Sequence, residues 1–360
     1  MAQKSKQWAA IIMMIALFAM IAFVTNLCSP MATIVKNQFG ASELAGQIGN
    51  YANFIAYLVM GIPSGMLIAK LGYKKTALLA LIVGIVGIVF EYLSGVVGSY
   101  VIYLVGAFIS GLCMCMLNTV VNPLLNVLGG GGKTGNQLIQ IGGAANSAAA
   151  VAVYILMGAL IGEVTKSTGI SDATPALIIA GVIFVIAFVI LLFTKIEEPE
   201  QAKVELSLIT GALKFRQLSL GALAIFLYMS VEVGTPTYMI SYLQTPEVGL
   251  SAGVAGLIAS VYWLMMFVGR SIGGSIGGKV SSRAMVSTVD TAAIALLLFG
   301  IFAPETMKVT VIGIDWGNLE VIYPQVPVCV LAFILVGLCT SVMWGGIFNM
   351  AVEGVGKYTA

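Results

Sequence analysis

The chain has 360 residues, of which 59% are hydrophobic and only 9% are charged, and it contains no histidine. A soluble domain carries about 25% charged residues, so this composition excludes a soluble protein of the same length. The net charge of +2 does not point to nucleic acid, and no nucleic-acid partner is expected. The sequence instead predicts an all-α, polytopic transmembrane helix bundle in contact with membrane lipid.

Apolar runs recur along the chain, and a spanning helix needs about 20 mostly apolar residues. We expect ten spans, near residues 8–28, 47–70, 76–95, 99–127, 137–161, 174–194, 217–244, 251–278, 284–303 and 326–350. The hydrophilic segment 195–216 is the one plausible linker. It separates a predicted six-helix bundle over residues 1–194 from an incomplete bundle of four helices over residues 217–360.

The positions of the cations predict the orientation of these spans. With both termini in the cytoplasm, only Lys36, Lys166 and Lys308 of the 17 Lys and Arg residues fall outside. Cytoplasmic loops of membrane proteins carry an excess of Lys and Arg. We therefore expect a multi-pass protein of the inner (cytoplasmic) membrane with both termini in the cytoplasm.

Two glycine-rich helix ends that run into basic turns suggest an internal repeat. Their glycines and cations are Gly61, Gly65, Lys70, Gly72, Lys74 and Lys75 after the second span, and Gly269 and Arg270 in the eighth. Helix packing and topology signals would explain either one alone. Their recurrence at corresponding places favours a transporter built from two pseudo-symmetric halves, in which these turns act in conformational gating.

The turn from Gly61 to Lys75 resembles the signature of the major facilitator superfamily, although Ala69 stands where an acidic residue is usual. Three further segments resemble the fucose permease branch, the fucose–galactose–glucose symporters: Leu117–Gly129, with its Asn122-Pro123 pair, Ala145–Ser147, and Val231–Tyr238 followed by Ser241–Leu243. The resemblance covers nearly the whole chain. It implies ion-coupled symport of a neutral hexose or deoxyhexose by alternating access, with polar side chains of helices one, four, five and seven facing a central cavity.

The chain departs from that branch at two acidic positions tied to proton coupling. Ser29 stands in place of the helix-one aspartate, and Asn118 stands in place of the helix-four glutamate. Neither side chain exchanges a proton near neutral pH. Glu91 and Asp290 lie near span ends, where each can reach the interface. Glu232 lies deep in the seventh span, where a charge is costly, so it is either the ion-coupling residue or a hydrogen-bonded structural one.

Neutral polar and aromatic side chains in the spans suit a sugar. The predicted substrate-binding residues are Asn26, Asn118, Asn122, Gln140, Asn146, Tyr238, Tyr242, Trp263 and Asn349. Amides supply paired donors and acceptors, and aromatic rings supply flat apolar faces. Each residue taken singly also fits helix packing or an interfacial aromatic belt. No Lys or Arg is expected in the middle of a span, which favours a neutral substrate over an anionic one.

Three other classes of protein are weighed against a sugar transporter. A drug or metabolite exporter of the same fold would share the halves and loops, but not a polar cavity. An intramembrane enzyme would need a metal cluster, a dyad or a reactive cysteine in context, and a channel would need a filter-like repeat; neither pattern is visible. We expect no enzymatic activity and no cofactor or metal, but a coupling ion, either a proton or sodium.

The superfamily has twelve spans in two six-helix bundles, whereas ten are expected here. The chain therefore looks truncated after helix ten, and we expect the 360-residue form to insert in the membrane but to transport poorly or not at all. We also expect a monomer. A ten-span transporter that dimerises to complete itself is the competing interpretation.

Overall fold

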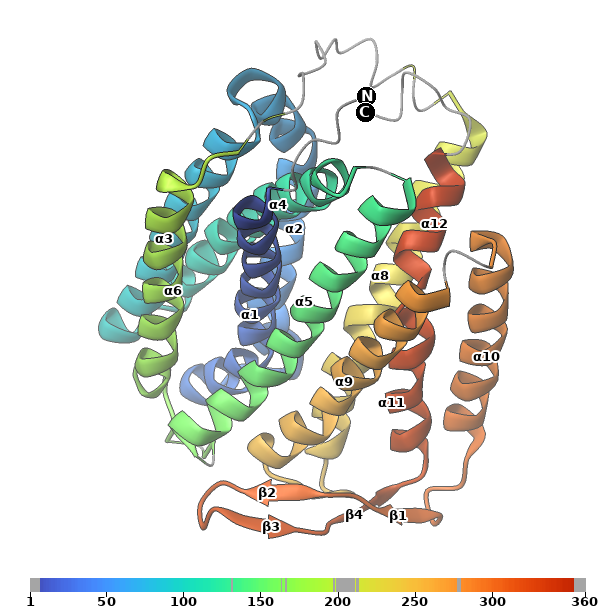
Figure 1. The fold of residues 1–360 in the computed structure, drawn as a ribbon. Helices are drawn as coiled ribbons and strands as arrows, with labels where there is room; N and C mark the ends of the chain where they lie inside the picture. The colour runs from blue at the N-terminus through green and yellow to red at the C-terminus, as the bar shows by residue number, and fades with distance from the viewer. Residues whose placement is uncertain are drawn as a thin grey trace. The chain divides into compact units, whose positions relative to one another are not determined.

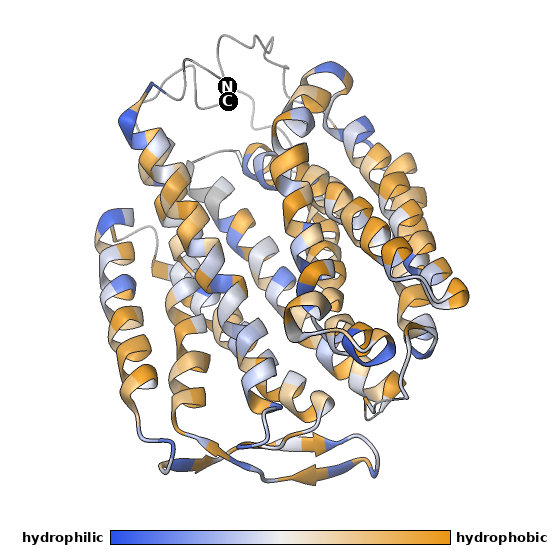
Figure 2. Ribbon diagram, turned by 180° about the vertical axis from the view of Figure 1, so that it is seen from behind, coloured by the Kyte–Doolittle hydropathy of each residue, from blue (hydrophilic) through white to orange (hydrophobic). Residues whose placement is uncertain are grey.

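The computed structural model describes residues 7–130, 132–162, 164–165, 167–196, 198, 211, 214–276 and 280–352. Ten helices among these residues are long and apolar enough to cross a membrane, which confirms the ten predicted spans. Figure 2 shows that hydrophobic residues cover most of each helix, with hydrophilic residues mainly at helix ends and in loops. The fold is therefore the polytopic helix bundle that the composition predicts.

The chain forms two compact units. Unit 1 comprises Met1–Gln201 and Trp316–Asn318, and unit 2 comprises Ala202–Asp315 and Leu319–Ala360. Most of the predicted linker 195–216 lies outside the described residues.

Unit 1 is a helical bundle around α1. Its elements are α1 (Trp8–Phe39), α2 (Glu43–Leu71), α3 (Tyr73–Val97), α4 (Tyr100–Leu128), α5 (Gly132–Ile161), the short 3-10 helix η1 (Ile170–Ala173) and α6 (Thr174–Phe193). Helix α1 packs against α2, α4 and α5, while α3 runs along α4 and also contacts α6 (Figure 1). The core of the unit is formed by side chains such as Leu17, Met114 and Leu117, all fully buried.

Unit 2 is a second helical bundle with a β-hairpin. Its helices are α8 (Arg216–Leu243), α9 (Ala252–Ile276), α10 (Ser282–Phe302), α11 (Cys329–Thr340) and α12 (Met343–Val352). Helix α11 packs against α9 and α10, and α12 packs against α8 and α10 (Figure 1). The loop between α10 and α11 forms strands β1 (Lys308–Thr310), β2 (Gly313–Asp315), β3 (Glu320–Ile322) and β4 (Gln325–Pro327). Antiparallel pairing joins β1 to β4 and β2 to β3.

The sequence prediction differs from the structure in three places. Helix α1 continues past Pro30 to Phe39 rather than ending near residue 28, and its extension is held by buried Met31, Ile34 and Val35. The last span is divided by a short turn into α11 and α12, and at this turn the hydroxyls of Thr340 and Ser341 donate hydrogen bonds to carbonyls of the preceding turn. The β-hairpin was not predicted, and its strands are only three residues long.

Close helix packing in unit 1 depends on glycine. A Cβ at Gly111 of α4 would collide with the backbone carbonyl of Asn53 in α2, and it would lie 2.7 Å from the Ala56 Cβ. Glycine lets two membrane helices approach this closely. We expect Gly111→Ala to destabilise the protein by about 1–3 kcal/mol, the usual cost of overpacking.

The matched control for that prediction is Gly234 of α8, where an added Cβ would meet nothing within 4 Å. Thermal unfolding of both purified alanine variants checks the comparison. A loss of stability for Gly111→Ala and none for Gly234→Ala is expected. Equal melting temperatures would contradict the packing argument.

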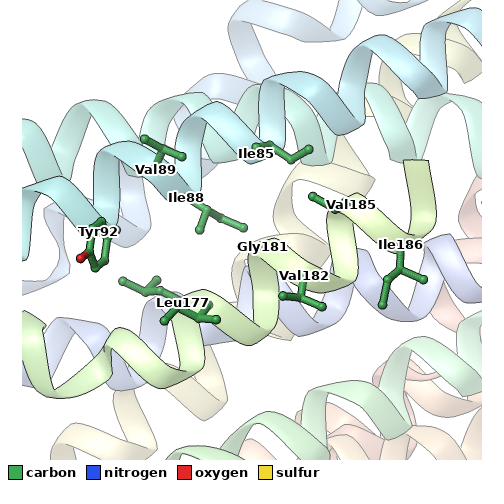
Figure 3. Close-up of a pocket in the computed structure, with 10 residues that line it drawn as sticks. Ile85, Ile88, Val89, Tyr92, Leu177, Gly181, Val182, Val185 and Ile186 are labelled. Carbon is green, nitrogen blue, oxygen red and sulfur yellow. The ribbon is translucent and has the colours of Figure 1, made fainter. Parts of the chain in front are cut away.

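An apolar groove lies between α3 and α6 of unit 1. Figure 3 shows its lining, which includes Ile85, Val89 and Tyr92 of α3 and Leu177 and Val182 of α6, around a volume of about 370 Å³. Val89, Tyr92 and Val182 are exposed. Because the lining offers almost no hydrogen-bonding groups, the groove suits lipid chains rather than a sugar.

Candidate functional site

In unit 1, a polar cluster joins α2 to α4. The Asn118 amide donates a hydrogen bond to the Tyr57 hydroxyl over 2.8 Å. One turn later, the Asn122 side-chain nitrogen donates to the backbone carbonyl of Asn118 at 3.2 Å. Pro123 follows inside α4 and removes one backbone donor. These residues therefore place amide and hydroxyl groups together inside a predominantly apolar bundle.

Two polar atoms at this cluster have no partner. The Asn122 side-chain oxygen is buried without a hydrogen bond, and so is the hydroxyl of Thr25 in α1, which lies near Tyr57. Buried polar groups are nearly always hydrogen-bonded, and an unsatisfied one has a free-energy cost. A ligand rich in hydroxyl groups would satisfy both atoms.

Three further predicted site residues of unit 1 lie at helix contacts. Asn146 of α5 donates to the Phe18 carbonyl of α1 at 2.8 Å, and so joins two helices. The Asn26 amide nitrogen donates to the Ala22 carbonyl one turn earlier on α1, and the side chain is 9% exposed. Gln140 is half-buried on α5. One N–H of Asn26 and one of Asn146 thus serve helix structure, which leaves the second N–H and the oxygen of each amide for a substrate.

Among the predicted residues of unit 2, Trp263 is the buried aromatic. Its indole N–H has no hydrogen-bond partner, and its ring lies edge-on to Tyr262 at 5.4 Å between centroids. Tyr242 lies 3.9 Å from the Cys329 sulfur. Tyr238 of α8 and Asn349 of α12 are exposed on their helices. Trp263 is therefore the residue of this set that presents an unsatisfied donor.

The structure corrects the prediction for Arg270. The sequence placed it near the cytoplasmic end of the eighth span, and no cation was expected in the middle of a span. Instead, an Arg270 guanidinium nitrogen lies 3.5 Å from a Glu232 carboxylate oxygen, and both side chains are largely buried, with exposures of 13% and 10%. The buried Glu232 carboxylate on α8 attracts the long, flexible Arg270 side chain inward, because each buried charge is stabilised by the opposite charge of the other.

The glycines of the two predicted gating turns have different surroundings. A Cβ added at Gly61 or Gly65 would meet open space, whereas a Cβ added at Gly269 would collide with Ser341 beyond the end of α11. Gly72 joins α2 to α3 with a φ of +88°, a conformation that favours glycine. Gly269 is thus a packing glycine, and Gly72 is a turn glycine.

The lysines after the second span contact the end of α6. Lys74 donates to the carbonyls of Leu192 and Thr194 at 2.9 and 2.8 Å. The Glu198 carboxylate in turn accepts from the backbone N–H groups of Tyr73 and Lys74, both at 3.0 Å. A carboxylate at a helix N-terminus and a cation at a C-terminus both interact favourably with the helix dipole. Lys70 and Lys75 are exposed.

Sequence reasoning missed Tyr57, Thr25 and Glu198. Tyr57 had a visible signal, since Asn50, Asn53 and Tyr57 recur every three to four residues along the otherwise apolar α2. Thr25 and Glu198 had none, because their neighbours come from distant parts of the chain.

This geometry agrees with comparisons to known proteins. The sequence profile of the Major Facilitator Superfamily matches residues 13–360. The chain is 24% identical over 351 residues to a glucose/galactose transporter of Brucella abortus, covering 96% of this chain and 80% of that protein. It is 21% identical over 337 residues to the L-fucose-proton symporter of Escherichia coli, covering 86% of this chain and 77% of that one.

Solved structures show the same fold. A crystal structure of the E. coli fucose:proton symporter superimposes with a TM-score of 0.74 at 19% identity, over 99% of this chain and 87% of that one. A D-xylose-proton symporter superimposes with a TM-score of 0.67 at 12% identity, over 95% and 81% of the two chains. Because the profile match runs through both helical units, the chain belongs to the Major Facilitator Superfamily.

Proposed function

We propose that this protein is a secondary active transporter for a neutral sugar, a hexose or deoxyhexose, that works by ion-coupled symport. The observation that carries the proposal is the polar cluster of Thr25, Tyr57, Asn118 and Asn122 in unit 1, with two buried polar atoms that lack partners. Sugar hydroxyls both donate and accept hydrogen bonds, and so match amide and hydroxyl side chains.

The charge distribution supports a neutral substrate. Arg270, a largely buried cation of α9, lies beside Glu232, so its charge is already balanced. An anionic substrate would need a cation that is available to it, because burying an unpaired charge is costly. The relatives support the same class, since they are named for glucose, galactose and fucose. The proposed function is therefore transport of a neutral sugar.

A panel of ligands tests the proposal on the purified protein in lipid nanodiscs. Neutral hexoses, hexose phosphates and lipophilic cations are compared by the rise in melting temperature that each produces, because a ligand that binds only the folded state stabilises it. Stabilisation by one or more neutral hexoses and by no hexose phosphate is expected. Stabilisation by lipophilic cations alone would identify an exporter of drugs instead.

The proposed location is the inner membrane with both termini in the cytoplasm, and cysteine labelling tests it. In a cysteine-free background, single cysteines replace Asp172, Glu305 and Lys214, which are all exposed. An impermeant thiol reagent added to intact cells is expected to label the first two positions and to miss position 214. Labelling of position 214 alone would reverse the assigned orientation.

A further inference from the structure

Two acidic side chains are buried among the described residues, Glu91 in unit 1 and Glu232 in unit 2, with exposures of 6% and 8%. Their surroundings differ in one respect. Glu232 has the Arg270 guanidinium at 3.5 Å. Glu91 forms no ion pair within the described part of the chain, and the Ser110 hydroxyl of α4 contacts its carboxyl oxygen at 2.8 Å. The sequence analysis expected Glu91 near a span end, within reach of the interface; in the structure its side chain is buried against α4.

Glycines close the space around the Glu91–Ser110 contact. A Cβ at Gly106 of α4 would lie 2.8 Å from the Glu91 Cγ, and one at Gly87 of α3 would lie 2.5 Å from the Ser110 Oγ. Helices α3 and α4 are thus in direct backbone contact on both sides of the pair. Tyr92, the next residue on α3, is 41% exposed, so it lies on a different face of the helix from the buried Glu91.

Within the described residues, no cation of the elements around α3 is paired with Glu91. Tyr103 of α4 and Cys28 of α1 are the titratable groups within electrostatic range, and both are neutral in their ordinary forms. Helix α6 has no titratable side chain, and α2 carries no charged residue between Leu44 and Ala69. Asp172 of η1 is exposed and accepts a hydrogen bond from the Gly169 N–H.

If Glu91 were ionised, its carboxylate would be stabilised only by a hydrogen bond from the neutral Ser110 hydroxyl. Burying a charge without a counter-ion costs far more than one such hydrogen bond returns, so the group takes up a proton instead. A serine hydroxyl suits both states, because it can donate to the carboxylate or accept from the carboxylic acid. The Arg270 guanidinium, in contrast, stabilises Glu232 as a carboxylate.

From this geometry we infer that Glu91 and Ser110 form a proton-binding site within unit 1, in which Glu91 is held as a neutral carboxylic acid. The carboxylate takes its proton from water and returns it to water when the site opens. If this proton is the coupling ion, the site replaces the two acidic side chains of the related symporters, at whose positions this chain has Ser29 and Asn118. That coupling role rests on the proposed sugar transport, whereas the proton site itself does not.

Infrared difference spectroscopy of the reconstituted protein tests the site directly. A protonated carboxylic acid has a carbonyl-stretching band that neither a carboxylate nor an amide shows. We expect this band in the wild type and in Glu232→Gln, and we expect its loss in Glu91→Gln. Ser110→Ala should keep the band but shift it to higher frequency, because its hydrogen bond is removed. A band that persists in Glu91→Gln, or that is lost only in Glu232→Gln, would overturn the inference.

A calorimetric measurement separates the coupling role from the proton site. The heat of sugar binding is measured in two buffers of different ionisation enthalpy, which gives the number of protons taken up per sugar. At a pH high enough for the infrared band of the sugar-free protein to be lost, the wild type is expected to take up about one proton per sugar and Glu91→Gln none. Equal proton uptake by both proteins would contradict the coupling role. Absence of binding heat with every hexose would contradict the proposed function, while the infrared result would still decide the proton site.

Discussion

Arg270→Gln is expected to lower the free energy of unfolding by about 3–5 kcal/mol, because it leaves the buried Glu232 carboxylate without its cation. Glu232→Gln should have a cost of the same order, since it leaves the guanidinium unpaired. Removing both charges together should cost much less than the sum of the two single changes. This result would show that the two charges stabilise the fold as an ion pair, and that either charge alone destabilises it.

A double-mutant cycle on the purified protein, with unfolding followed by titration with SDS, measures this coupling. Arg283, which is exposed on α10, supplies the control. Arg283→Gln is expected to change stability by less than about 0.5 kcal/mol, as for most surface substitutions. Single effects at Arg270 and Glu232 that simply add would show that the two side chains do not interact.

Asn118→Ala is expected to weaken sugar binding by roughly 1–3 kcal/mol, the cost of leaving a buried hydrogen-bonding group without its partner. That range corresponds to a loss of about 5- to 150-fold in affinity. The Tyr57 hydroxyl, which accepts from Asn118 at 2.8 Å, would lose its donor in the same variant. Tyr57→Phe should therefore also weaken binding, while leaving the ring packing in place.

Affinity and stability must be measured on the same variants, because Asn118 also joins α2 to α4. Asn37→Ala is the matched control, since Asn37 donates to the Thr165 carbonyl at 3.1 Å and is no part of the cluster. This control should leave sugar affinity unchanged. If Asn118→Ala lowers the melting temperature but retains the affinity of the wild type, Asn118 is a helix-packing residue.

The helices could be predicted from the sequence because each span is a local property of composition. Long apolar runs indicated all ten spans, because backbone groups in a bilayer must be hydrogen-bonded within the protein and an apolar run satisfies them by forming a helix. The end of α1 was misplaced because Pro30 normally interrupts a helix, whereas membrane helices tolerate an internal proline. The hairpin from β1 to β4 was missed because three-residue strands leave too short an alternating pattern.

The site could be predicted only as a set of residue types. Asn118 and Asn122 were found because amides are conspicuous in an apolar helix. Their partner Tyr57 lies 61 residues from Asn118 in the chain, so no periodicity within one helix connects them. The inward turn of Arg270 was missed for the same reason, because a basic residue near a helix end normally extends to the headgroup region.

Equilibrium dialysis of the purified, lipid-embedded protein against radiolabelled hexoses tests the central claim most directly. The proposal predicts saturable binding of at least one neutral hexose, displaced by the same unlabelled sugar and weakened in Asn118→Ala. Hexose phosphates should not compete, because the buried Arg270 is already paired with Glu232 and would not offset their charge. Absence of saturable binding for fucose, galactose and glucose alike, from a protein with an intact thermal transition, would contradict the account.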